Sequence, residues 1–457
     1  MSIVRFFLMT LLILPLTLFA EESDPIVVRL ATESQLLPLY LAKFYNDNSG
    51  FDAEYLNKLE SVLLFDLSHN AMTYPVPHTT DRDAQAAKES FEQSPNAQAW
   101  KNLNVFYVIK ARVKNKTLSV QMLSVNSGSI KNVGGLSLTG TLSKDRRQIH
   151  QVADMIHKVL FGTDGIASTH ILFTWKKQEG TNSRQWTSEV WESDYDGGNA
   201  RQLTRNDGYC VTPVYLPPKV GSSPGSFFYV SYQTGQPKIY MASLKDGKPQ
   251  RFSLLRGNQL MPAISRQRDK VALICDITGN PDLFLQPFSV EAGAVGKPQQ
   301  IFATHQATQA TPTFSPDGKK IAFVSNKDGS PRIYVMDVPS PGTPPKTVSA
   351  KLITKHNKES SAPEWSPDGT KIAYCSLTKG VRQIWIYDFA SNAERQVTQG
   401  AGNKENPTWA PNSLHLIFNS TDADASDLFL INLNQPEATK ISSGVGEKHF
   451  PNWEPRT

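Results

Sequence analysis

The sequence predicts a mainly β protein, a six-bladed β-propeller closed by its C-terminal strand and preceded by a small α/β domain. The first observation is a repeat, because similar proline-centred segments recur at 213, 262, 312, 363, 407 and 451, with intervals of 49, 50, 51, 44 and 44 residues. A period in this range is typical of stacked units that cannot bury their hydrophobic faces alone. The second is that the last copy, Phe450–Pro455, opens a unit that the following residues do not complete.

Each repeat is long enough for four short strands. In the unit at Pro312, a first strand ends at Phe314, and Ser-Pro-Asp-Gly at 315–318 forms a tight turn. Proline presets φ at the second turn position, and glycine takes the left-handed position. Three further strands are expected at 321–325, 332–337 and 351–354. Four antiparallel strands per repeat of this length are one propeller blade.

The two ends of the repeat region are predicted to share a blade. Residues 171–204 contain the second, third and fourth strands of a blade, at 171–173, 190–192 and 201–204, but no first strand. We expect Pro451–Pro455 to supply it by pairing beside Ile171–Thr174. Such closure leaves no long sheet edge open to another chain.

The residues before the propeller divide into two parts. Residues 1–20 carry one positive charge, Arg5, and an apolar run before Glu21-Glu22, which is typical of a secretory signal peptide. Residues 21–162 are expected to form the α/β domain and residues 163–457 the propeller. The elements expected in the α/β domain are a strand or arm at 26–30, helices at 52–68 and 83–91, a strand at 71–74, a hairpin of 105–112 with 117–125, a strand at 136–142, and a helix capped by Ser143 that stops at Gly162.

Composition excludes several classes of partner and cofactor. The net charge is +5 and no dense Lys/Arg run occurs, so nucleic acid is not expected as a partner. No stretch after the signal peptide is apolar enough to cross a membrane. The odd number of cysteines, Cys210, Cys275 and Cys375, indicates buried free thiols. No metal or cofactor is expected, because the nine histidines lack metal-ligand spacing, and His150 and His157 lie two turns apart on one helix.

Two short motifs resemble catalytic or metal-binding sites. Gly221–Gly225 matches the serine-hydrolase elbow around Ser223, but the next residue, Pro224, lacks the N–H that the oxyanion hole requires. We therefore expect no catalytic residues there. Asp422–Asp427 alternates oxygen ligands as a calcium loop would, but has Asp427 where an EF-hand needs glycine, so a solvated turn is the favoured interpretation.

The repeat and its flanks resemble the TolB family, periplasmic propeller proteins of the Gram-negative Tol–Pal envelope system. The resemblance rests on the repeated Pro-x-Trp/Phe-Ser-Pro-Asp-Gly units, on the ending Phe450–Pro455, on Ser193–Gly197 and on the junction Phe161–Ile171. It implies a non-enzymatic, exported scaffold in the periplasm, which supports envelope integrity and constriction during cell division.

The same resemblance implies two partners. The lipoprotein Pal would dock at the mouth of the propeller channel, on the loops that run into the anchor prolines; here these carry Asn258, Met261, Gln309, Ala310, Glu359, Ser361, Asn403, Glu405, Glu447 and His449. The inner-membrane protein TolA would contact the N-terminal arm, at Glu22, Asp24, Ile26 and Val28. The following segment, Gln35–Leu41, departs from the family's usual motif. Other envelope proteins are possible further partners.

Two other functions stay open from the sequence. A propeller-based hydrolase or another channel-site enzyme would need histidines and carboxylates that converge from several blades, which the sequence neither shows nor excludes. Peptidoglycan binding would rest on exposed aromatic residues alone. Within the scaffold hypothesis, Glu359, Glu405 and Glu447 predict an acidic sector at the channel mouth.

Overall fold

The computed structural model describes residues 35–178, 186–205, 208–423, 425–435 and 437–456. All of these residues belong to one compact unit. The expected strand or arm at 26–30 and the expected signal peptide at 1–20 lie outside the described residues. Within the described residues, no helix is both long enough and apolar enough to cross a bilayer.

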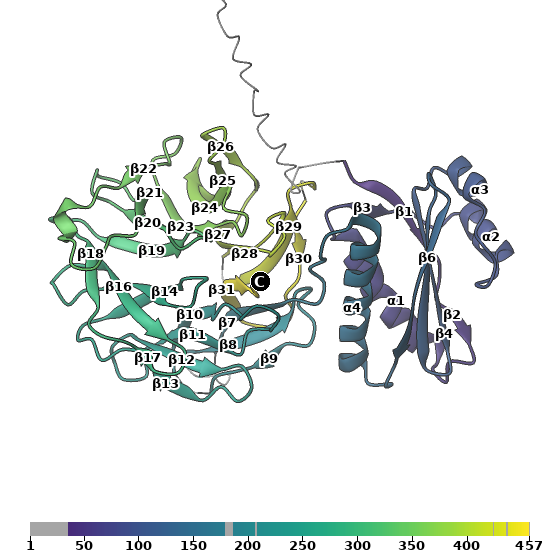
Figure 1. Cartoon of the computed structure of the whole chain (residues 1–457), viewed down its shortest axis with the longest axis horizontal. Helices are drawn as coiled ribbons and strands as arrows, with labels where there is room; N and C mark the ends of the chain where they lie inside the picture. Colours follow the sequence, from purple (N-terminus) through teal and green to yellow (C-terminus); the bar gives the residue numbers. More distant parts are fainter. Residues whose placement is uncertain (1–34, 179–185, 206–207, 424, 436, 457) are drawn as a thin grey trace, which may run out of the picture. The chain divides into compact units, whose positions relative to one another are not determined.

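The first part of the described chain is a sheet covered by helices (Figure 1). The sheet has the order β3-β1-β4-β5-β6, with β2 beside β4. Helices α1 and α4 cover one face through Leu59, Ile149 and Val152, and Trp100 of α3 packs on the opposite face. The elements are β1 (Leu37–Leu41), β2 (Tyr45–Asp47), α1 (Ala53–Ser68), β3 (Thr73–Pro75), α2 (Thr80–Lys88), α3 (Ala97–Asn102), β4 (Tyr107–Lys114), β5 (Thr117–Ser124), β6 (Ser129–Ser137) and α4 (Leu142–Phe161).

The sequence located most of these elements but missed three. β1, β2 and α3 were not predicted, and β1 is the buried strand that pairs with both β3 and β4. The strand expected at 136–142 was misplaced, because β6 runs from Ser129 to Ser137 and residues 138–141 belong to no strand. The predicted cap of α4 was also wrong, because Thr141 is the N-cap residue and its side chain makes no capping hydrogen bond. The predicted stop at Gly162 is confirmed, since Gly162 is left-handed at φ 76°.

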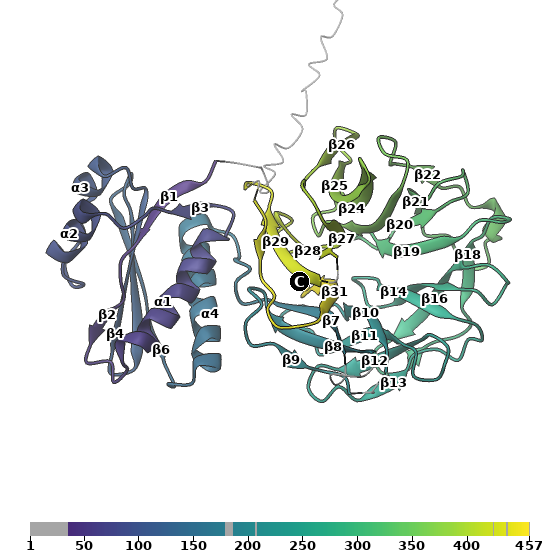
Figure 2. The ribbon, with the colours of Figure 1, turned by 180° about the vertical axis from the view of Figure 1, so that it is seen from behind.

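The rest of the chain forms six sheets arranged as the blades of a propeller, which Figure 2 shows from behind. Each blade runs from an innermost strand outward, and the predicted fold class is confirmed. The strands are β7 (His170–Gln178), β8 (Trp186–Asp194) and β9 (Arg201–Gln202); β10 (Cys210–Tyr215), β11 (Ser226–Ser231), β12 (Lys238–Ser243) and β13 (Pro249–Arg251); β14 (Gln259–Ile264), β15 (Lys270–Cys275), β16 (Asp282–Ser289), β17 (Gly293–Ala294) and β18 (Gln299–Phe302); β19 (Gln309–Phe314), β20 (Lys320–Ser325), β21 (Arg332–Asp337) and β22 (Lys351–Leu352); β23 (Ser360–Trp365), β24 (Lys371–Thr378), β25 (Val381–Asp388) and β26 (Ala393–Gln396); β27 (Asn403–Trp409), β28 (His415–Asp422), β29 (Ala425–Asn432) and β30 (Thr439–Lys440); and β31 (Glu447–Trp453).

The ring is closed by β31, which pairs antiparallel with β7 and completes the first blade. The strand starts earlier than predicted, since the pairing runs from Glu447 opposite Lys176 to Trp453 opposite Ile171. Trp453 is 3% exposed, and its indole Nε1 donates to Thr169 Oγ1 at 2.8 Å. Closure therefore rests on backbone pairing and on one buried aromatic side chain.

Two smaller expectations are also confirmed. Cys210, Cys275 and Cys375 are buried, and within the described residues none of the three forms a disulfide. The aromatic residues at the position of Trp453 in the other repeats are buried: Tyr215, Phe314, Trp365 and Trp409. They pack at the inner ends of the blades, as expected of the repeat, and their edges form part of the wall of the cavity at the propeller axis.

We predict that Trp453→Ala lowers the free energy of unfolding by about 3–5 kcal/mol, because truncation removes a buried indole and leaves a cavity at the closure. Trp186→Ala is the matched control, since Trp186 is 43% exposed at the start of β8. Urea unfolding followed by circular dichroism measures both variants. Equal stability of the two variants would show that the closure does not depend on Trp453.

Candidate partner-binding channel

Six innermost strands surround the axis of the propeller: β10, β14, β19, β23, β27 and β31. Each contacts the next around the ring, and β10 contacts β31, so the ring of strands is complete. Figure 1 shows them nearest the centre of the blades. All six run in the same sense, so the segments that enter them meet at one end of the axis and the turns that leave them meet at the other.

Every innermost strand is interrupted by a β-bulge at its anchor proline. The residue before the proline has a positive φ in all six repeats: Thr212 (48°), Met261 (53°), Thr311 (40°), Ala362 (49°), Asn406 (52°) and Phe450 (52°). A positive φ is unfavourable for every residue other than glycine, and most of all for the β-branched Thr212 and Thr311. Six repeats of one strained geometry indicate that the surrounding ring imposes it.

The bulges place a ring of prolines around a cavity of about 480 Å³. The lining continues into the turns that leave the innermost strands, at Pro217, Pro316, Pro367 and Pro411. The cavity therefore lies between the bulges and these turns. Its described lining is largely apolar and includes three charged side chains, Glu364, Arg266 and Arg456.

Glu364 is the cavity residue that sequence reasoning missed. It is half-buried, and its Oε1 accepts a hydrogen bond from Thr408 Oγ1 at 3.1 Å. Burial raises the pKa of the Glu364 carboxyl from its ordinary value of 4.5 to about 8, although the hydrogen bond from Thr408 opposes the shift. A carboxyl with a raised pKa in a cleft is a candidate binding residue. The sequence could have pointed to Glu364, because it directly follows the anchor proline Pro363.

At the equivalent position in other repeats, the side chain joins neighbouring blades. Asn452 Oδ1 accepts from the backbone N–H of Tyr215 at 2.9 Å, and Thr408 Oγ1 accepts from that of Trp453 at 3.0 Å. These bonds satisfy backbone donors in the innermost strands. The lining of the channel is therefore cross-linked between blades and is rigid.

The ten residues predicted to contact Pal lie on the entry side of the bulges, where several of them directly precede residues that line the cavity. They are at or just before the N-terminal ends of the innermost strands, and none of them lines the cavity: Asn258, Met261, Gln309, Ala310, Glu359, Ser361, Asn403, Glu405, Glu447 and His449. Met261 and Ala310 are half-buried, and Met261 Sδ accepts from the backbone N–H of Thr311 at 3.2 Å. Gln309 is 2% exposed, so its side chain belongs to the interior of the blade.

Ion pairs reduce the acidic character expected of this mouth. Glu405 pairs with Arg382 at 3.2 Å, and Glu447 pairs with Lys176 at 3.1 Å. Within the described part of the chain, Glu359 forms no ion pair. Two of the three glutamates expected to form an acidic sector are therefore paired with cations.

The other expected sites fall elsewhere. The arm residues Glu22, Asp24, Ile26 and Val28 lie outside the described residues. Ser223 is exposed in the loop between β10 and β11, not in a strand-to-helix turn. Asp427, from the calcium-like motif, pairs with Lys440 of the same blade and with Lys448 of β31 in the closing blade, and Asp424 lies outside the described residues.

We predict that Glu364→Gln leaves stability unchanged at pH 4 and raises it at pH 9 by roughly 1–3 kcal/mol. The folded state favours the protonated Glu364, whose pKa rises from 4.5 to about 8. Its contribution to stability is therefore complete below pH 4.5 and is lost as the pH rises to about 8. The measurement is the difference in urea midpoint between variant and wild type across this range. A constant difference would show that Glu364 titrates normally.

Comparisons with known proteins give the family. The family model described as "TolB beta propeller domain" matches residues 157–350 and 346–457. A relative called "Protein TolB homolog" from Protochlamydia amoebophila is 58% identical over 385 residues, covering 84% of this chain and 82% of its own. A protein of the same name from Chlamydia abortus is 37% identical over 390 residues, covering 85% and 84%. The crystal structure of TolB from Acinetobacter baumannii shares the fold, with a TM-score of 0.75 and 21% identity over 93% of this chain and 98% of that one. The repeat, the six-bladed ring and these relatives together show that the chain belongs to the TolB family.

Proposed function

We propose that this protein is a periplasmic, non-enzymatic scaffold of the Tol–Pal system. It binds Pal at the outer membrane and peptidoglycan, and it connects Pal to TolA of the inner membrane. Through this link it supports envelope integrity and the constriction of the envelope during cell division. Membership of the TolB family carries the proposal.

The mouth of the channel suits a protein partner. Loops held by a rigid scaffold are where binding residues collect, and here the blades fix the six segments that enter the innermost strands. Met261 and Ala310, both half-buried, give this rim an apolar sector beside the charged pairs of Glu405 and Glu447. An apolar centre within a polar rim is the usual anatomy of a protein interface.

The N-terminal arm is the proposed contact for TolA. Its residues Glu22, Asp24, Ile26 and Val28 precede β1, which starts at Leu37. The acidic and β-branched character of the arm suits pairing of an extended segment with a partner. This part of the proposal rests on the family resemblance and is tested by binding of TolA to a chain that lacks residues 21–30.

The competing enzymatic function has weak chemical support. Acid–base catalysis in the channel would need at least two convergent titratable groups. The described lining of the cavity contributes a single carboxyl, Glu364, and no histidine. Pro224 follows Ser223 and has no N–H to donate to an oxyanion.

We expect Ser223→Ala to leave folding and partner binding unchanged, because Ser223 is exposed in the β10–β11 loop. A fluorophosphonate probe should not label the native protein. Labelling that disappears in Ser223→Ala would support the hydrolase instead.

We predict that Met261→Arg or Ala310→Arg weakens Pal binding by about 2 kcal/mol, close to thirtyfold in Kd, because a charged side chain replaces apolar contact at the centre of the interface. Calorimetric titration with purified Pal measures the change. Val295→Arg is the control, since Val295 is 44% exposed and lies between the outer strands β17 and β18, away from the segments that enter the innermost strands.

The controls separate the possible outcomes. Circular dichroism confirms that each variant folds. Wild-type affinity in both mouth variants would mean that Pal does not dock at this end of the channel. Titration of Glu364→Gln then tests the proline-lined cavity.

A further inference from the structure

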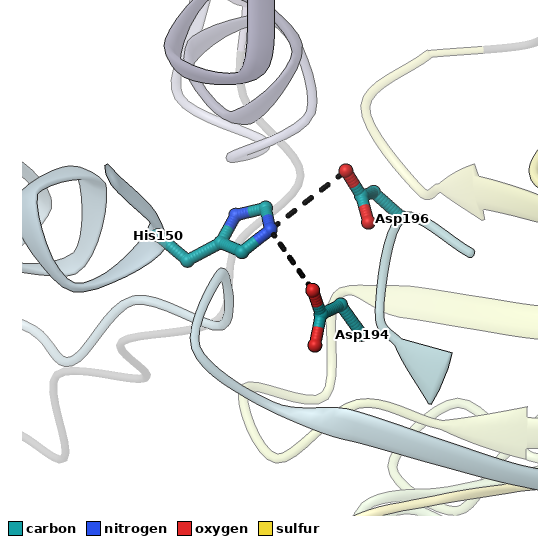
Figure 3. Close-up of side chains that lie close together, drawn as sticks. All are labelled: His150, Asp194 and Asp196. Carbon is teal, nitrogen blue, oxygen red and sulfur yellow. Dashed lines mark ion pairs between the residues drawn. The ribbon is translucent and has the colours of Figure 1, made fainter. Parts of the chain in front are cut away.

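A buried histidine faces two carboxylates where α4 meets the first blade (Figure 3). His150 lies on α4, and Asp194 and Asp196 lie at the end of β8 and in the turn that follows it. His150 is 1% exposed and Asp194 is 2% exposed. One atom from each residue, His150 Nε2 and a carboxylate oxygen from each aspartate, lie within 4.8 Å of one another.

The hydrogen bonds made by Nδ1 of His150 determine which ring nitrogen carries the proton in the neutral ring. Nδ1 lies 2.9 Å and 3.0 Å from the two carboxylate oxygens of Asp66. Asp66 Oδ1 also accepts the hydroxyl proton of Tyr195 at 2.8 Å. A carboxylate can only accept, so Nδ1 carries the proton and the lone pair of the neutral ring is on Nε2. A carboxylate behind a histidine in this way is the usual support of a metal-binding imidazole.

His150 Nε2 has no hydrogen-bond partner among the described residues, although it is buried. It lies 3.8 Å from Asp194 Oδ2 and 3.8 Å from Asp196 Oδ2. These distances are too long for a hydrogen bond. A lone pair that faces two carboxylate oxygens is repelled by them, whereas a metal ion or a proton on Nε2 would be attracted by both. A buried group in this position requires an explanation.

The two carboxylates are oriented toward this point by their other contacts. Asn199 Nδ2 donates to Asp194 Oδ2 at 2.6 Å, and Arg146 donates to Asp196 Oδ2. The backbone N–H of Gly198 donates to Asp196 Oδ1 at 2.9 Å. Each of the two facing oxygens can still offer a lone pair to a metal ion.

We propose that His150, Asp194 and Asp196 bind a divalent transition-metal ion, with Zn²⁺ as the best fit. One imidazole and two carboxylates are suitable ligands for Zn²⁺, at about 2.0–2.2 Å from the metal. The two distances of 3.8 Å from Nε2 to the carboxylate oxygens would need to shorten by a few tenths of an ångström to reach that geometry. A fourth position would be taken by water, as in zinc sites with three protein ligands.

The site would join two parts of the chain that are distant in sequence. His150 comes from the helix that covers the N-terminal sheet, whereas Asp194 and Asp196 come from the first blade. Bound metal would therefore fix α4 against the propeller, and its binding energy would add to the stability of the folded chain. This inference does not depend on the proposed partners.

The test uses the untagged protein, stripped of metal by a chelator that is then removed. Calorimetric titration with ZnCl₂ should give about one equivalent bound, and thermal unfolding should shift to higher temperature with Zn²⁺. His150→Gln and Asp196→Asn should each weaken Zn²⁺ binding at least about tenfold and abolish the thermal shift. Asp196→Asn serves as the second variant because it keeps the size of the side chain and leaves His150 in place.

His157→Gln is the matched control, since His157 lies on the same helix, is 6% exposed and is held by Thr163 at 3.1 Å away from the two aspartates. It should bind Zn²⁺ as the wild type does. The proposal is overturned if the wild type binds no Zn²⁺, which would leave a water molecule or a proton between the three groups. It is also overturned if binding persists in both His150→Gln and Asp196→Asn.

Discussion

The structure depends on the pairing of β31 with β7, because this contact turns a row of blades into a ring. Without it, the innermost strands of the first and last blades would lose their neighbours, and two sheet edges would be open to other chains. The pairing joins residues more than 270 positions apart, such as Glu447 and Lys176. Closing so long a loop costs entropy, which the ladder and the burial of Trp453 must offset.

Closure also determines how the channel is built. The bulge at each anchor proline turns the backbone at the axis, at the cost of a positive φ in the preceding residue. Prolines then line the cavity, and side chains such as Thr408 and Asn452 join adjacent blades. The strained backbone at the axis and the rigidity of the channel therefore both result from closure of the ring.

The residues after β31 connect the closed ring to the rest of the chain. Glu454 accepts from the backbone N–H of His170 at 2.8 Å, and Arg456 pairs with Asp154 of α4 at 3.0 Å. His415 Nε2 meets the backbone carbonyl of His69, after α1, at 2.6 Å. Closure and the position of α1 and α4 are therefore linked, and the group around His150 lies within this same contact region.

The sequence by itself determined the fold class, because the proline-centred period and the Ser-Pro-Asp-Gly turns are local signals that repeat. It also determined α1, the β4–β5 hairpin and the stop of α4 at Gly162, which follow from helical spacing and turn chemistry. Only the tertiary structure decided what depends on distant neighbours. β1 was missed because Leu37–Leu41 is short and its pairing with β3 and β4 is parallel and non-local. The positive φ before each proline, the raised pKa of Glu364 and the meeting of His150 with Asp194 and Asp196 arise from packing between blades or between α4 and the first blade, and no spacing along the chain encodes them.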